Sequence, residues 1–172
     1  MSAFYWKQYF INEILQKKGM RPVTTDLGVA ACLVEKNKIL LVKEGKGPQN
    51  GLWGLPKGSV DEGELPQLAV KRELREECGI DVKILGLVGL RECLIKETPA
   101  IFMAYLVNSI NPIIEIDNDE IIDYGWFEVE DFQTLSWISE AMKELAKKAI
   151  TNYDGEMIDY TEKRGRNYFL YL

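Results

Sequence analysis

Three glutamates gather near the C-terminal end of a helix that the sequence predicts over residues 66–78. Glu73, Glu76 and Glu77 lie in the segment RELREECGI, residues 72–80, and share one face of that helix at about 100° per residue. Like charges three or four residues apart repel by roughly 0.2–0.5 kcal/mol per pair. The helix macrodipole also disfavours negative charge at this end. The folded protein therefore has to place positive charge, from side chains or a bound cation, next to this face of the helix.

Two sources of positive charge are compatible with the segment taken alone. Arg72 and Arg75 are near enough in sequence to neutralise the acids on a solvated surface, and Arg72 stands four residues before Glu76. Alternatively, the carboxylates bind a metal, because they are hard oxygen ligands of the kind that Mg²⁺ or Mn²⁺ prefers. A bound cation makes neighbouring acids mutually tolerable. The residues before the helix favour this second explanation.

The preceding loop extends the acidic segment into a longer motif. Glu64 lies eight residues before Arg72, and Gly58 lies six residues before Glu64. Residues 58–80 match the pattern G-x5-E-x7-R-E-U-x-E-E-x-G-U without a gap, where U is a bulky aliphatic residue. The nine specified positions are Gly58, Glu64, Arg72, Glu73, Leu74, Glu76, Glu77, Gly79 and Ile80. This string resembles the signature box of the Nudix hydrolases, and GLWGLPKG resembles the W-x-L-P-x-G stretch that leads into it.

The resemblance implies a metal site. In Nudix hydrolases the glutamates of R-E-U-x-E-E bind a divalent cation, which implies Glu73, Glu76 and Glu77 as ligands here. The backbone carbonyl of the residue before the first box glycine often joins them, and that residue is Lys57. The implied cofactor is Mg²⁺ or Mn²⁺. Gly58 would let the backbone approach the metal and the phosphates closely.

Further residues are implied to support or complete this site. Arg72 and Glu64 are expected to hold the loop and the helix together. The family frequently has an acid six residues before a strand tryptophan, and Glu120 lies six residues before Trp126. Glu120 or one of the box glutamates is the expected general base. The alternatives in the same acidic loop are Asp117, Asp119 and Asp123, and a solvated turn explains that loop equally well.

Several cations are candidates for contacts with phosphate in the substrate. Lys43 and Lys46 stand at the end of the second predicted strand and just after it, Lys57 precedes the first box glycine, and Arg91 follows a later strand. For each of them taken alone, an exposed surface position is the simpler account. Phe102 and Tyr105 lie on a strand that could face a base, although a place in the core is expected for both.

Composition limits the chemistry available to the chain. Its 172 residues carry a formal charge of −6 and include no histidine. Histidine metal ligands and the usual Ser-His or Cys-His nucleophiles are therefore excluded. The acidic balance disfavours nucleic acid or an anionic membrane as a partner, and no apolar run is long enough to span a bilayer. Cys32, Cys78 and Cys93 form no CxxC pair, which is typical of a reducing cytosol, so a cytoplasmic location is expected.

The order of predicted elements indicates an α/β fold. Strands are expected at 27–34, 38–43, 82–90, 100–107 and 122–129, and helices at 66–78 and 137–151. The glycine-rich residues 44–64 are expected to form a long loop. This order predicts helices layered on a mixed sheet. The resemblance implies the Nudix-type α/β/α sandwich with a mixed β-sheet, while the sequence leaves open whether the two helices cover opposite faces.

Both ends of the chain fall outside the part that resembles the family. We expect a single domain over 1–172 with a core of about 25–151, extended by an amphipathic helix at 4–18 and an aromatic tail at 153–172. Each end carries more apolar side chain than a lone element should expose. Two arrangements are open: the ends pack together within one chain, or they join two subunits in a homodimer.

The resemblance implies an enzyme, a pyrophosphatase that acts on a phosphoric anhydride. The expected reaction is Mg²⁺-dependent hydrolysis of a nucleoside diphosphate linked to another moiety, by attack of water at phosphorus. The partner is then a small nucleotide diphosphate derivative. The alternative is a catalytically silent Nudix-fold sensor of nucleotides, which the complete box disfavours. ADP-ribose, dinucleoside polyphosphates and nucleoside triphosphates all stay open as substrates, because residues 95–98, IKET, carry no subgroup marker.

Overall fold

The computed structural model describes residues 24–110, 113–117, 119–151, 153–159, 162 and 169–171. The helix expected at 4–18 and most of the aromatic tail lie outside these residues. The expectations for the two ends, including the homodimer, therefore stay predictions. No helix within the described residues is long and apolar enough to cross a membrane.

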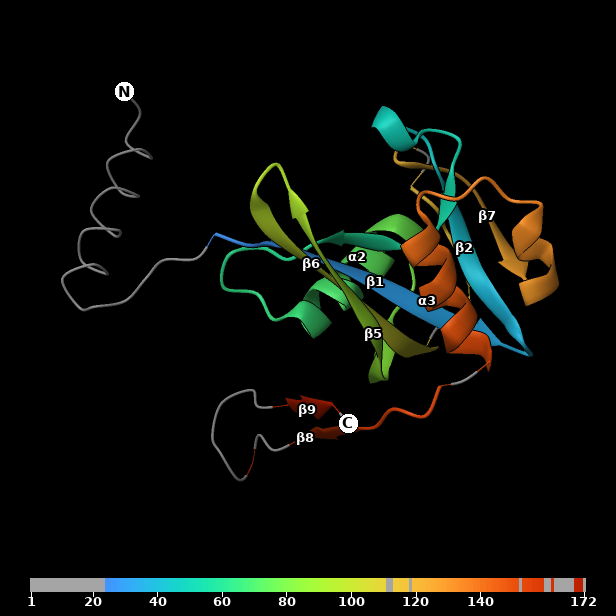
Figure 1. Ribbon diagram of the computed structural model, residues 1–172. Helices are drawn as coiled ribbons and strands as arrows, with labels where there is room; N and C mark the ends of the chain where they lie inside the picture. Colours follow the sequence, from blue (N-terminus) through green and yellow to red (C-terminus); the bar gives the residue numbers. More distant parts are fainter. Residues whose placement is uncertain are drawn as a thin grey trace.

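A mixed sheet is organised around the strand β1, which is parallel to β6 and antiparallel to β2 and β4 (Figure 1). The strand β6 also pairs with β5, and β2 pairs with β3 and β7, in each case antiparallel. The strands of this sheet are β1 (Asp26–Glu35), β2 (Lys38–Glu44), β3 (Trp53–Gly54), β4 (Lys57–Ser59), β5 (Val82–Ile95), β6 (Thr98–Ser109) and β7 (Ile121–Phe127).

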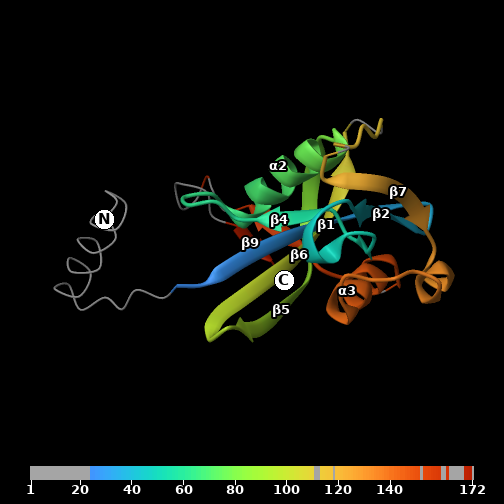
Figure 2. The ribbon, with the colours of Figure 1, turned by 90° about the horizontal axis from the view of Figure 1, so that it is seen from above.

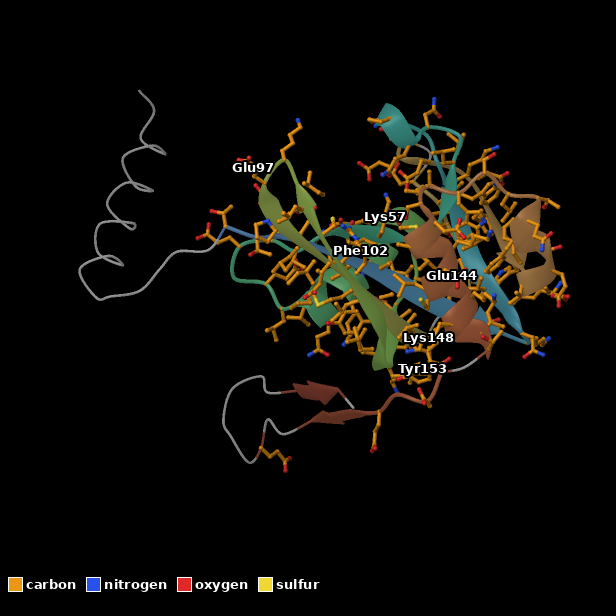
Figure 3. The ribbon with its side chains drawn as sticks, in the orientation of Figure 1. Lys57, Glu97, Phe102, Glu144, Lys148 and Tyr153 are labelled. Carbon is orange, nitrogen blue, oxygen red and sulfur yellow. The ribbon has the colours of Figure 1, made fainter. Side chains whose placement is uncertain are left out.

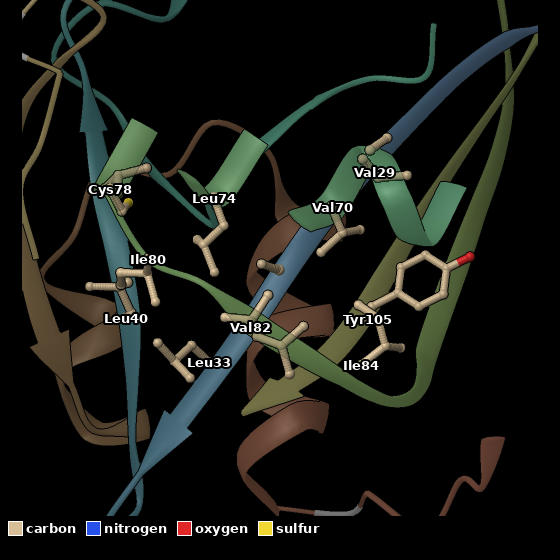
Figure 4. Close-up of a cluster of buried hydrophobic side chains, with 14 of the residues drawn as sticks. Val29, Leu33, Leu40, Val70, Leu74, Cys78, Ile80, Val82, Ile84 and Tyr105 are labelled. Atoms are coloured by element: carbon tan, nitrogen blue, oxygen red, sulfur yellow. The ribbon is translucent and has the colours of Figure 1, made fainter. Parts of the chain in front are cut away.

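Two helices cover opposite faces of this sheet. Alternate side chains of β1 point to opposite sides, so Val29 and Leu33 join one buried cluster while Ala30 and Cys32 join the other. The helix α2 (Pro66–Cys78) packs on the first cluster, which Figure 4 shows in close-up. The helix α3 (Glu140–Thr151) packs on the second, and Figure 2 shows the two helices on either side of the sheet. The predicted α/β/α sandwich is confirmed, and the question of the helix faces is settled.

The helix α2 has the bounds that its sequence predicts. Pro66 begins it, where a missing backbone N–H costs no hydrogen bond. Gly79 ends it in the left-handed conformation with φ of 68°, and its N–H donates to the carbonyl of Arg75 at 3.0 Å. Leu74 and Cys78 are fully buried against the sheet. Of the three glutamates, Glu77 is buried as well, whereas Glu76 is exposed.

The expected long loop at 44–64 is wrong in detail, because neighbouring strands supply backbone partners. Within it lie the short 3-10 helix η1 (Gly47–Gln49) and the strands β3 and β4, which pair with β2 and β1. Other bounds also move. The strands β5 and β6 run several residues beyond the prediction as one long hairpin, and α3 begins at Glu140 rather than 137. Ser139 precedes α3, and its Oγ accepts the N–H of Met142 at 3.2 Å.

After β7 the chain forms a second 3-10 helix, η2 (Val129–Gln133), and then α3. The strands β8 (Met157–Asp159) and β9 (Phe169–Tyr171) pair as a separate two-stranded sheet. Tyr153 packs on the cluster beneath α3, and a Cβ at Gly86 would lie 1.7 Å from its hydroxyl oxygen. Glycine at that position of β5 therefore makes room for the start of the tail.

Candidate active site

Arg72 fastens the glycine-containing loop to the helix α2. Its Nε donates to Glu64 Oε1 at 3.1 Å, and its Nη2 donates to Glu64 Oε2 at 3.0 Å and to the carbonyl of Ser59 at 2.9 Å. This paired geometry is the strong form of an arginine–carboxylate contact. The hydrogen bond from Arg72 holds the pKa of Glu64 below its ordinary value. The loop and the helix thus behave as one unit.

The same guanidinium also neutralises two acids of the box. Nη1 of Arg72 donates to Glu73 Oε1 at 2.7 Å and to Glu76 Oε2 at 3.2 Å. The side chain of Glu76 is 59% exposed, whereas that of Glu73 is 15% exposed. Burial raises the pKa of Glu73 despite the contact with Arg72. Arg75, the other arginine of the segment, turns away and pairs with Asp81.

Gly58 leaves the space that the Glu73 carboxylate occupies. A Cβ added at Gly58 would lie 1.9–2.2 Å from the carboxyl carbon and oxygens of Glu73, so the carboxylate would have to move away. The strand β4 can therefore lie directly against the acidic face of α2. The spacing between the box glycine and the box glutamates has a steric reason here.

Glu77 is the buried acid of the set. It is 4% exposed, and its Oε2 accepts the backbone N–H of Lys57 at 3.1 Å. Burial raises the pKa of Glu77 to about 8, although the nearby charge and N–H of Lys57 oppose the change. Without a cation, this carboxyl therefore holds its proton at neutral pH.

The acidic loop before β7 reaches the same region. The N–H of Asp117 donates to the carbonyl of Glu77 at 3.1 Å, and the N–H of Gly45 donates to the carbonyl of Glu120 at 2.7 Å. The negative charge of Glu120 contributes to the raised pKa of Glu73, which places the two carboxylates near each other. The carboxyl oxygens of Asp117 and Asp123 accept local backbone N–H groups instead.

A cavity of about 360 Å³ is linked to these acids through Lys57, which lines it and whose backbone N–H donates to Glu77. Its wall combines two cations, Lys57 and Arg91, with the ring of Phe102, and apolar side chains of α3 and of the residues before it close it. The guanidinium of Arg91 lies 5.7 Å from the centre of the Phe102 ring. Figure 3 shows Lys57 and Phe102 in this part of the molecule. The described lining residues include no acid, so this cavity suits an anionic ligand with an apolar or ring-shaped part.

The remaining candidate residues are placed less centrally. Lys43 lies 5.6 Å from the centre of the Trp53 ring, and Lys46 is exposed just before η1. Within the described residues, no hydrogen bond or ion pair joins either lysine to the box glutamates. Tyr105 is a core residue at 3% exposure, as expected.

Glu44 is a charged residue of this region that the sequence does not single out. Its Oε1 accepts the Nζ of Lys57 at 2.7 Å, and its charge contributes to the raised pKa of Glu77. Glu44 ends β2 and Lys57 begins β4. Both strands pair with β1, and this arrangement brings the two residues together. No local pattern links two residues across such a loop.

The residues fit a hard divalent cation in type and burial. Glu73 and Glu77 are largely buried carboxylates, and Gly58 brings the backbone against them. As they are placed, however, Arg72 occupies oxygens of both Glu73 and Glu76. Among the residues that the structure describes, no three acidic or cysteine side chains form a ready-made metal centre. The box carboxylates are suitable ligands for a divalent cation, and their arrangement around a bound cation stays a prediction.

A family model described as the NUDIX domain matches residues 24–149. The chain belongs to the NUDIX domain family. The predicted resemblance is thereby confirmed, and Nudix hydrolases as a family use divalent metal ions.

Curated Nudix relatives match a large part of the chain. Nudix hydrolase 7 of Arabidopsis thaliana is 28% identical over 160 residues, covering 84% of this chain and 56% of the relative. The ADP-ribose pyrophosphatase of Methanocaldococcus jannaschii is 35% identical over 85 residues, covering 47% of this chain and 50% of the relative. The chain thus spans about half the length of these curated relatives.

Solved Nudix structures share the fold. The MutT NUDIX hydrolase from Burkholderia pseudomallei superposes with a TM-score of 0.64 at 27% identity, over 72% of this chain and 97% of that one. A UDP-X diphosphatase superposes with a TM-score of 0.64 at 22% identity, over 83% of this chain and 70% of that one. The second likeness concerns the fold alone.

Proposed function

We propose that this Nudix protein is a hydrolase, dependent on Mg²⁺ or Mn²⁺, that cleaves a nucleoside diphosphate linked to another moiety. The observation that carries the proposal is the position of Lys57, which donates its backbone N–H to the box acid Glu77 and also lines a cavity with a second cation and an aromatic ring. The acids would hold the cation, the cation would bind the pyrophosphate, and the cavity would hold another part of the substrate. Relatives named as an ADP-ribose pyrophosphatase and an 8-oxo-dGDP phosphatase support the reaction class.

The proposed cation ligands are Glu73, Glu76 and Glu77, with the backbone carbonyl of Lys57. When bound, the cation supplies charge neutralisation for the pyrophosphate and acidifies water. Gly58 and Arg72 keep the ligands in place, Gly58 by leaving space and Arg72 by its contacts with the loop. Arg91 would donate to an anionic group in the cavity, with Phe102 beside it.

The chain has no histidine, so the general base is proposed to be a carboxylate. Candidates are Glu120 and the box glutamates. Burial raises the pKa of Glu73 and Glu77 in the metal-free protein, and as cation ligands these two carboxylates would lose that added basicity. Glu120 is exposed and lies near Glu73, where it can reach a water on the solvent side. A Glu120→Gln variant that loses kcat while keeping KM would identify it as the base.

A substrate screen tests the function. The protein is incubated with Mg²⁺ and ADP-ribose, 8-oxo-dGDP, a UDP-sugar or a dinucleoside polyphosphate, and products are separated by chromatography. At least one compound should be hydrolysed with Mg²⁺ and not with EDTA, and Glu77→Gln should lower kcat/KM by about a hundredfold or more. Tight binding of a compound without turnover would instead identify a sensor. Equal turnover by Glu77→Gln would remove this residue from the proposed ligand set.

A further inference from the structure

Lys57 connects the acids to the cavity through three separate contacts. Its backbone N–H donates to Glu77 at 3.1 Å, its Nζ donates to Glu44 at 2.7 Å, and the residue lines the cavity. Arg91 is the other cation of that wall. A change in the position of the Lys57 side chain therefore changes the charge that a ligand meets where the acids and the cavity adjoin.

The ion pair of Lys57 with Glu44 is well shielded from water. The two side chains are 18% and 13% exposed, so solvent screens their attraction only partly. The backbone of Glu44 is itself fixed, because its N–H donates to the carbonyl of Leu52 at 3.0 Å and its carbonyl accepts the N–H of Gly51 at 2.7 Å. The backbone position of Glu44 is thus fixed, and its carboxylate can hold the longer lysine side chain in place.

The Lys57 ammonium has more N–H donors than its contact with Glu44 uses. An ammonium group has three N–H donors, and Glu44 is the acceptor recorded for Nζ within the described residues. Without Glu44 the ammonium could turn to Glu77, whose carboxyl oxygen already accepts the backbone N–H of the same residue. An ammonium on Glu77 would block the acid and leave the cavity wall.

We propose that Glu44 is a positioning residue that holds the Lys57 ammonium at the cavity wall, where its free N–H groups donate to a phosphate oxygen of the substrate. The proposal rests on the proposed phosphoanhydride hydrolysis and adds to it a residue outside the signature box. It concerns the lysine side chain only, so the backbone carbonyl of Lys57 is unchanged in every variant below.

A double-mutant cycle with Glu44→Gln, Lys57→Met and the double variant tests this. Lys57→Met should raise KM about tenfold, the size of one charge-assisted hydrogen bond, with kcat within about threefold of wild type. Glu44→Gln should raise KM similarly, and the double variant should be no worse than Lys57→Met alone. Lys38→Met is the control, because Lys38 lies on β2, the strand of Glu44, and its ammonium pairs with the exposed Glu128 at 3.4 Å.

Two outcomes would overturn the inference: an unchanged KM in Lys57→Met, or effects that multiply in the double variant, since Glu44 would then act independently of the lysine. Should Glu44→Gln fail to fold, Glu44→Asp carries the test, because it keeps the charge but draws the carboxylate back by one methylene, and it should also raise KM. Calorimetric titration with inorganic pyrophosphate and Mg²⁺ compares the same variants for binding. This measurement needs no turnover, so it decides the role of Lys57 even where the proposed hydrolysis fails.

Discussion

Replacing Glu77 by glutamine should invert the stability difference between variant and wild type as pH rises. Burial raises the pKa of the metal-free Glu77 carboxyl from 4.5 to about 8. The folded state then keeps a proton that the unfolded chain has already released, so the free energy of unfolding falls with rising pH between these values. A shift of this size corresponds to roughly 5 kcal/mol lost by the wild type across the window.

Glutamine does not titrate and nearly preserves the shape of glutamate. Its amide oxygen can accept the N–H of Lys57, but its buried amide N–H groups find fewer acceptors, at a cost of about 1–3 kcal/mol. Near pH 5, Glu77→Gln should therefore be less stable than wild type by that amount. Near pH 9 it should be more stable by about 2–4 kcal/mol, because the wild type then carries a buried charge.

Urea unfolding in EDTA, followed by tryptophan fluorescence at pH 5, 7 and 9, measures the difference. Glu76→Gln is the matched control, since the same charge one residue away is 59% exposed and its removal should change stability by less than about 1 kcal/mol at every pH. A Glu77→Gln difference that stays constant within about 1 kcal/mol from pH 5 to 9 would refute the reasoning. Glu77 would then be ionised throughout, and its burial would carry no electrostatic penalty.

Three further outcomes follow from the same geometry. Mg²⁺ should raise the melting temperature more at pH 8.5 than at pH 6, because it competes with the proton on Glu77; scanning fluorimetry at both pH values measures this. Gly58→Ala should abolish that Mg²⁺ response and lower kcat by about a hundredfold, because the new Cβ displaces the Glu73 carboxylate; circular dichroism should show an intact fold. Arg72→Lys should destabilise the protein by about 1–3 kcal/mol in urea unfolding, because an ammonium cannot reproduce the two-point contact with Glu64.

The parts of the fold that the sequence predicted best are those with local causes. The bounds of α2 follow from Pro66 and Gly79, whose backbone preferences act within a few residues. The ends of β5 and β6 were missed, because the hairpin continues past the core with exposed Leu94 and Ile95, and no alternation marks its end. The strands β3 and β4 were missed because glycine-rich segments pair only where a neighbouring strand offers partners.

The candidate site divides in the same way. The box residues could be named because their spacing along one loop and one helix is a local pattern. The acidic loop is different, since four acids fitted the sequence and only the fold brings Glu120 near Glu73. Glu44 could not be named at all, because its contact with Lys57 depends on how β2 and β4 are arranged on β1.

The two explanations first open for the acidic face apply to different glutamates. Arg72 donates to Glu73 and Glu76, so neutralisation within the chain accounts for those two acids. It does not account for Glu77, because the ammonium nearest to it belongs to an ion pair with Glu44 and, within the described residues, no cationic side chain pairs with Glu77. The buried acid therefore has two ways to be stable at neutral pH, a proton or a bound cation. Among the three glutamates, Glu77 would be stabilised most by a bound divalent cation. Its replacement therefore best distinguishes a metal site from a charged surface.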